Sequence, residues 1–169
     1  KAQILSSEDQ YTSIYFEGKS LQFLNKKFGS VFPKVHHLQK DFFIMDWIEH
    51  NNKIDCFSEK DLAKKISAIH SLKNDKFGFD YNSPIGGIEQ PSKPQKNWVE
   101  FYKINRLQMI FDIINNTNPL PNDVNKGIEK IINNLNNYLP NSPSPSLIHG
   151  DLWQGNILFN NGILVGLID

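Results

Sequence analysis

The sequence is poor in several features that define specialised classes of protein. Cys56 is the only cysteine among 169 residues, so no disulfide can form within the chain, and we expect a cytoplasmic protein. No apolar run approaches the roughly 20 residues of a membrane-spanning helix, and nothing resembles a signal peptide. The 18 basic and 18 acidic residues give no net charge that would gather phosphates. We therefore expect neither a membrane nor a nucleic acid as a partner.

Arginine is nearly missing as well, because Arg106 is the only one and every other basic residue is a lysine. We expect Arg106 to donate to a structural ion pair. The hydrophobic share of 39% and the aromatic share of 12% exclude wholesale disorder. They allow one packed domain or pieces of a larger one. The chain begins at Lys1 and stops at Asp169 directly after an apolar run, so we expect both ends to cut through structure.

The first part of the chain predicts a strand, a helix and a hairpin. Residues 1–5 fit the end of a strand, and residues 6–9 offer capping and first-turn side chains for a helix that ends near Phe28. The segments 35–38 and 42–47 predict a hairpin. Its second strand is apolar almost throughout, so we expect it to be buried on both faces.

Two adjacent histidines, His36 and His37, lie on the first strand of this hairpin. Neighbouring residues on a strand point to opposite faces. The pair is therefore a poor metal chelate, and we do not expect a zinc site there.

The rest of the chain predicts a largely helical region, and the order of elements is that of an α+β fold. Ser58 and Asp61 have the spacing of a capping box, which predicts a helix that ends near residue 72. Residues 73–96 are expected to be irregular, and two helices should follow over 98–115 and 123–139. The second of these helices is expected to turn four apolar residues inward: Ile128, Ile131, Ile132 and Leu135.

The most informative segment is HGDLWQGN at 149–156, because it combines groups that phosphoryl transfer needs. That reaction requires a carboxylate to take the proton of the acceptor hydroxyl, and oxygen ligands for Mg²⁺ on the nucleotide phosphates. Asp151 and Asn156 lie in one loop. The Asn-Gly pair at 161–162 predicts a tight hairpin, which would return Asp169 to the side of Asn156. These residues predict phosphoryl transfer from ATP with Mg²⁺.

This loop resembles that of protein kinases, which have the same spacing from Asp to Asn and a metal-binding Asp after the next hairpin. Gly150 stands where protein kinases have arginine, as in the aminoglycoside and choline kinase branch, which phosphorylates small molecules. Trp153 and the whole string make the sequence most similar to the fructosamine (ketosamine) kinase family. Five further blocks resemble that family in the right order: FEGKSL at 16–21, FFIMDWI at 42–48, ISAIHSLKNDKFGFDY at 66–81, GGIEQPSKPQKNW at 86–98 and WVEFYKINRL at 98–107.

The resemblance implies a protein-kinase-like, two-lobe α+β fold that is truncated at both ends. Residues 1–48 would form part of the N-lobe and the hinge strand. Residues 49–169 would form part of the helical C-lobe, with the catalytic loop and the metal-binding aspartate. Such a chain alone is expected to be poorly active or inactive.

The resemblance also implies a role for each matching residue of the loop. Asp151 would be the base that orients and deprotonates the acceptor hydroxyl. Asn156 and Asp169 would hold Mg²⁺ on ATP, and His149 would brace the loop. Whether Trp153 contacts the acceptor or only packs stays open.

ATP would be bound by the first part of the chain. Lys1 would contact the phosphates, and main-chain groups of Asp46 and Ile48 would bind adenine. The family usually has a glutamate where Lys19 stands, and that glutamate is the partner of the ATP lysine. Glu17 is two residues away, roughly on the opposite side of a helix, so we expect it to be no simple substitute.

The implied reaction moves the γ-phosphate of ATP onto the 3-hydroxyl of a fructosamine. The phosphorylated adduct is unstable and regenerates the amine, so the activity would repair glycated lysines or other amines. Two alternatives stay open at this point. The protein could be a kinase of an amino sugar, choline or another small alcohol, or a catalytically silent nucleotide-binding module. The sequence predicts no oligomeric state.

Overall fold

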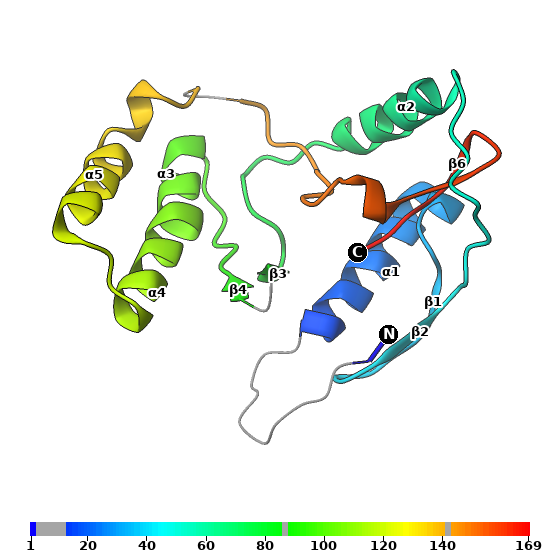
Figure 1. Ribbon diagram of the computed structural model, residues 1–169, viewed down its shortest axis with the longest axis horizontal. Helices are drawn as coiled ribbons and strands as arrows, with labels where there is room; N and C mark the ends of the chain where they lie inside the picture. The colour runs from blue at the N-terminus through cyan, green and yellow to red at the C-terminus, as the bar shows by residue number, and fades with distance from the viewer. Residues whose placement is uncertain (3–12, 86–87, 141–142) are drawn as a thin grey trace. The chain divides into compact units, whose positions relative to one another are not determined.

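The computed structural model describes residues 1–2, 13–85, 88–140 and 143–169, which form helices and short antiparallel hairpins (Figure 1). The chain divides into two compact units. Lys1–Leu72 together with Leu147–Asp169 make unit 1, and Lys73–Ser146 make unit 2. The expected helix start at 6–9 lies outside the described residues. The expected lobe boundary at residue 48 stays a prediction.

Unit 1 begins with a helix packed on a hairpin. Helix α1 (Ser13–Phe28) is followed by the short 3₁₀ helix η1 (Gly29–Val31), and then by strands β1 (Val35–Leu38) and β2 (Phe43–Met45). Gly18 lies inside α1, where glycine weakens an isolated helix. A Cβ at this position would lie 2.6 Å from Cδ1 of Leu38 and 3.1 Å from Cδ1 of Phe43. The glycine therefore lets the helix approach the hairpin closely.

The prediction that the second strand is buried on both faces is wrong. Phe43 is only 1% exposed, but Ile44 is 54% exposed and Trp47 is 79% exposed. Only one face of the two-stranded hairpin packs on α1, and successive side chains of a strand alternate between faces. In the described part of the predicted first strand, Lys1 pairs with Phe43 through two main-chain hydrogen bonds of 2.9 and 3.0 Å.

The predicted hairpin near the end of the chain is confirmed. Strands β5 (Ile157–Asn160) and β6 (Ile163–Leu167) pair antiparallel, with Asn160 opposite Ile163. Asn161 and Gly162 have φ values of 49° and 83°, which is the left-handed geometry of a tight hairpin turn. The hairpin contributes to the core of unit 1, whose most deeply buried side chains are Phe32, Phe43, Ile69, Leu164 and Leu167.

Helix α2 (Ser58–His70) is fastened to this hairpin by the two residues predicted to form a capping box. The Ser58 hydroxyl donates to the Gly162 carbonyl at 2.9 Å, and Asp61 accepts from the Leu164 N–H at 2.9 Å. The carboxylate of Asp55 accepts from the first N–H groups of the helix instead. The capping-box prediction is therefore wrong, because a tertiary contact recruits both side chains.

Unit 2 contains a hairpin within the segment predicted to be irregular. Strands β3 (Ser83–Ile85) and β4 (Ile88–Gln90) pair antiparallel. The predicted helix over 98–115 is present as a continuous run of α3 (Trp98–Tyr102), a π-helical segment η2 (Lys103–Gln108) and α4 (Met109–Thr117). A π-helical turn inserts an extra residue into the ladder of hydrogen bonds, which apolar periodicity does not reveal.

Two side chains of the π-helical segment attach the preceding loop to the helix. Asn105 is fully buried and accepts from the Lys93 N–H at 3.3 Å. Arg106 donates to the Pro91 carbonyl at 2.7 Å and lies over the Phe101 ring, 4.9 Å from its centre. Arg106 therefore binds a main-chain carbonyl and an aromatic face where we expected an ion pair.

Helix α5 (Asn122–Asn133) and the 3₁₀ helix η3 (Leu135–Asn137) complete unit 2. Ile132 and Leu135 are buried as expected, but Ile131 is 50% exposed. Each helical residue turns by about 100°, so Ile131 lies beside the buried stripe and not within it. Among the helices of the described residues, none is both long and apolar enough to cross a membrane.

The attachment of α2 to the hairpin gives a prediction about stability. Ser58→Ala removes a fully buried hydroxyl that donates to Gly162 and accepts from the Asp55 N–H at 2.8 Å. The free energy of unfolding should fall by about 1–3 kcal/mol, because buried polar groups lose their partner. Urea denaturation followed by circular dichroism measures the loss. Ser71→Ala is the control, since that hydroxyl is exposed and bonds only within its own helix; equal losses would contradict the prediction.

Candidate functional site

The loop at 149–156 owes its shape to two glycines. Gly150 has a φ of +96°, a conformation that other residues adopt only with strain. Gly155 lies under the indole of Trp153, where an added Cβ would come within 2.5 Å of the ring. The short 3₁₀ helix η4 (Gln154–Asn156) then leads into β5. The glycines thus explain why this backbone turns sharply around Asp151 and Trp153.

The structure brings Asp151 and Asn156 into contact. Asn156 is 5% exposed, and its Nδ2 donates to the main-chain oxygen of Asp151 at 3.0 Å and to its Oδ2 at 3.3 Å. The Asp151 side chain itself is exposed. The main-chain oxygen of Asn156 accepts from the Ile168 N–H at 3.1 Å, so the hairpin returns the residue before Asp169 to this loop.

Asp169 also meets Lys1, the other predicted nucleotide-binding end of the chain. The Lys1 Nζ lies 2.5 Å from Oδ1 of Asp169 and 2.8 Å from Oε2 of Glu17. We expected Glu17 to be no simple substitute for a glutamate at position 19, but the structure brings its carboxylate into contact with Lys1. Glu17 lies three residues after Ile14 and four before Leu21, both buried, so it shares the face of α1 that packs on the hairpin. That spacing was the signal in the sequence.

Burial and hydrogen bonds shift the pKa values of the two acids in this cluster in opposite directions. The hydrogen bond from Lys1 lowers the pKa of Asp169, although its partial burial opposes this shift. Burial raises the pKa of Glu17, and the contact with Lys1 only partly offsets that rise. Burial also acts to lower the pKa of Lys1, but its hydrogen bonds and charge interactions with Asp169 and Glu17 together raise it. Lys1 is therefore held as a cation between two acids.

His149, which we expected to brace the loop, is partly buried. Burial lowers the pKa of its imidazole, while Asp151 and a hydrogen bond with the backbone of Ile168 act in the opposite direction. A neutral ring bound to the chain just before Asp169 suits a supporting role. Trp153, by contrast, is 56% exposed beside Asp151 and is available to a ligand.

The predicted adenine-binding residues lie at the end of β2. The Asp46 N–H donates to the Lys34 carbonyl at 2.9 Å, and the Ile48 carbonyl accepts from the His50 ring at 2.9 Å. The Ile48 side chain packs on Gly166 of β6, where an added Cβ would lie 2.7 Å from it. Among the hydrogen bonds of the described residues, neither the Asp46 carbonyl nor the Ile48 N–H takes part, so these are the main-chain groups that a base could use.

The chemistry of the loop fits a magnesium ion. Because the Asn156 N–H₂ group is turned to Asp151, its amide oxygen is the end left for a ligand, and Asp169 has a second carboxylate oxygen besides the one on Lys1. Both are hard oxygen donors of the kind that Mg²⁺ takes together with phosphate and water. Within the described residues, no group of three or more His, Cys, Asp or Glu gathers as a metal site, so these two oxygens would need nucleotide and water as further ligands.

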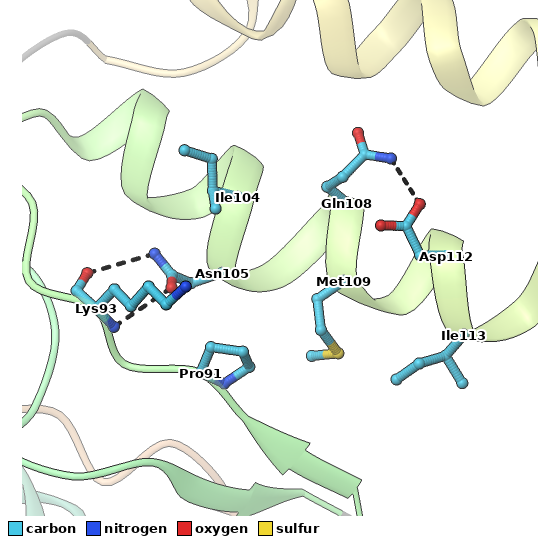
Figure 2. Close-up of a pocket in the computed structure, with 8 residues that line it drawn as sticks. All are labelled: Pro91, Lys93, Ile104, Asn105, Gln108, Met109, Asp112 and Ile113. Carbon is cyan, nitrogen blue, oxygen red and sulfur yellow. Dashed lines mark hydrogen bonds between the residues drawn. The ribbon is translucent and has the colours of Figure 1, made fainter.

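Unit 2 has a cavity of about 400 Å³ beside its π-helical segment, drawn in Figure 2. Pro91, Met109 and Ile113 supply apolar walls, and Gln108 donates to Asp112 at 2.8 Å. Its only carboxylate is therefore already bound, and no second acid lines it. The cavity lacks the paired groups of phosphoryl transfer, so the candidate site is the one in unit 1.

The chain matches a known protein family and several of its members. Residues 4–166 match the fructosamine kinase family. The probable ketoamine kinase YniA of Escherichia coli (strain K12) is 26% identical over 145 residues, which cover 83% of this chain and 49% of the relative. The chain thus spans about half the length of the curated relatives of this kind.

Solved structures share the fold. A candidate fructosamine-3-kinase from Thermobifida fusca superposes with a TM-score of 0.80 at 25% identity, over 98% of this chain and 57% of that one. APH(2")-IIa, in a ternary complex with streptomycin and ATP, superposes with a TM-score of 0.60 at 22% identity, over 93% of this chain and 54% of that one. The predicted kinase-like α+β fold is confirmed.

The family match extends over nearly the whole chain and includes the loop with Asp151 and Asn156. It agrees with the family that the motif and the accompanying sequence blocks indicate. The chain belongs to the fructosamine kinase family.

Proposed function

We propose that the protein is an ATP-dependent kinase that phosphorylates the 3-hydroxyl of ketosamines, and that it thereby takes part in deglycation. The observation that carries this proposal is the ion-pair cluster of Lys1, Glu17 and Asp169, joined through the hairpin to the loop of Asp151 and Asn156. A cation for phosphates, oxygen donors for a metal and a carboxylate for a hydroxyl are the groups that phosphoryl transfer uses.

The names of similar proteins support a ketosamine as the acceptor and ATP as the donor. The Escherichia coli relative is named as a probable ketoamine kinase, and the Thermobifida fusca structure as a candidate fructosamine-3-kinase. APH(2")-IIa binds ATP, which supports ATP as the donor here. It also binds streptomycin, so an aminoglycoside is the alternative acceptor to be tested.

Asp151 would act on the acceptor. Its exposed carboxylate takes the proton from the 3-hydroxyl while that oxygen attacks the γ-phosphorus of ATP, and ADP leaves with the bridging oxygen. Asn156 fixes the carboxylate through its contacts with the main chain and side chain of Asp151. The exposed indole of Trp153 lies where it can pack on the sugar of the ketosamine.

Lys1 would neutralise charge on the phosphates of ATP, and Glu17 would keep the lysine in place. Asn156 and Asp169 would hold Mg²⁺, which supplies further positive charge beside the transferred phosphoryl group. The Asp46 carbonyl would accept from the adenine amino group, and the Ile48 N–H would donate to the ring.

The role of Asp151 predicts the effect of Asp151→Asn. The amide cannot take the proton, so kcat should fall by about 10²- to 10⁴-fold while ATP binding persists. ADP release by the full-length gene product with fructosyl-lysine as acceptor measures turnover in this and the following variants, and Asp41→Asn, another exposed aspartate, is the control. Retained turnover in Asp151→Asn would refute this base. Turnover with streptomycin or choline but not with fructosyl-lysine would select the alternative acceptor class.

The ion-pair cluster predicts the effect of Glu17→Gln. Losing a charge-assisted hydrogen bond to Lys1 should lower kcat/KM for ATP by about tenfold or more. Lys19→Gln is the matched control on the same helix and should stay near the wild type. If the position of Lys19 mattered instead, Lys19→Glu would raise kcat/KM and Glu17→Gln would change little.

The exposed indole predicts a change in acceptor affinity. Trp153→Ala should raise KM for fructosyl-lysine by about two- to tenfold with a smaller change in kcat, because an aromatic packing surface is lost. Gly155→Ala keeps the indole but forces it away from the loop, and it should shift KM in the same direction. An unchanged KM in both variants would assign Trp153 to packing alone.

A further inference from the structure

Strand β1 contains an irregularity that the proposed function does not use. Val35 pairs with Met45 and His37 pairs with Ile44. Two steps along β1 therefore match one step along β2, and His36 is the extra residue of a β-bulge. Bulges redirect a side chain and occur often next to active sites.

His36 reaches across to Asp46, the residue directly after β2. Its Nε2 lies 2.6 Å from Oδ1 of Asp46. The other carboxylate oxygen, Oδ2, accepts from the Lys34 N–H at 3.1 Å, and the Asp46 N–H donates to the Lys34 carbonyl at 2.9 Å. Both carboxylate oxygens and the N–H of Asp46 are thus held by the segment 34–36. These contacts hold the residue whose remaining main-chain group, the carbonyl, the proposed function assigns to adenine.

The hydrogen bonds also lower the pKa of the Asp46 carboxylate. The contact with His36 is the largest influence in this direction, followed by the Lys34 N–H. An ionised carboxylate accepts stronger hydrogen bonds than a neutral one, so both contacts favour its charged form.

We infer that His36 is a positioning residue for the nucleobase, because it holds Asp46 in the orientation in which its carbonyl accepts from the adenine amino group. This inference rests on the proposed function, which assigns that carbonyl to adenine. His36 bonds to Asp46, which is assigned to the base and not to the phosphates or the acceptor, so the inference predicts an effect on affinity for the base. His37, its neighbour, stacks on Phe42 with ring centres 5.4 Å apart and makes no such contact with Asp46.

The test compares ligands with and without a base. Calorimetric titrations with Mg·ADP and with Mg·tripolyphosphate are made on the wild type, His36→Ala, His36→Gln and the matched control His37→Ala. His36→Ala should weaken ADP binding by about two- to fivefold, the range for a solvent-exposed pair of polar side chains, and leave tripolyphosphate binding unchanged. His36→Gln, which keeps an N–H donor, should recover part of the ADP affinity. His37→Ala should bind ADP like the wild type.

A double-mutant cycle identifies the partner. Adding His36→Ala to Asp46→Ala should cause no further loss of ADP affinity if His36 acts through Asp46. Unchanged ADP affinity in His36→Ala, or equal losses for ADP and tripolyphosphate, overturns the positioning role while the proposed kinase function stands. If the wild type binds ADP no more tightly than tripolyphosphate, the adenosine adds no affinity. That result overturns the adenine site, and this inference with it.

Discussion

The arrangement of unit 1 around its candidate site depends on one cation, the ammonium group of Lys1. Glu17 comes from α1, Asp169 follows β6, and Lys1 itself pairs with β2. The two carboxylates share one ammonium group, and like charges this close would repel each other without it. The same attraction contributes to the raised pKa of Lys1 and to the lowered pKa of Asp169. The cation connects three segments that no continuous sheet joins.

Local sequence patterns could predict the loop and its hairpin. The Asn-Gly turn and the alternation of the two strands are short-range signals. They correctly predicted a hairpin that brings the chain back to Asn156. The family could also be recognised, because the loop and the accompanying blocks lie in a distinctive order. The spacing of Glu17 from the buried residues of α1 also indicated that Glu17 faces the hairpin. We expected otherwise, because residues 17 and 19 lie on opposite sides of a helix.

Other features could not be predicted because tertiary contacts overrode local preferences. Ser58 and Asp61 have the spacing of a cap, but the carbonyl and N–H groups of β6 and its turn compete for them. The π-helical segment depends on the hydrogen bond between Asn105 and the main chain of Lys93. The spacing of apolar residues does not predict this contact. The bulge at His36 depends in the same way on Asp46, ten residues later in the chain.

Unit 1 is built from two stretches of chain with the whole of unit 2 between them. During synthesis from the N-terminus, α1 and the first hairpin emerge long before β5 and β6, so their apolar faces lack part of their core until late. Unit 2 is one continuous stretch of chain and can complete its own packing earlier. The segment with Asp151 also supplies β5 and β6 to the core of unit 1, so the candidate site forms when that core closes.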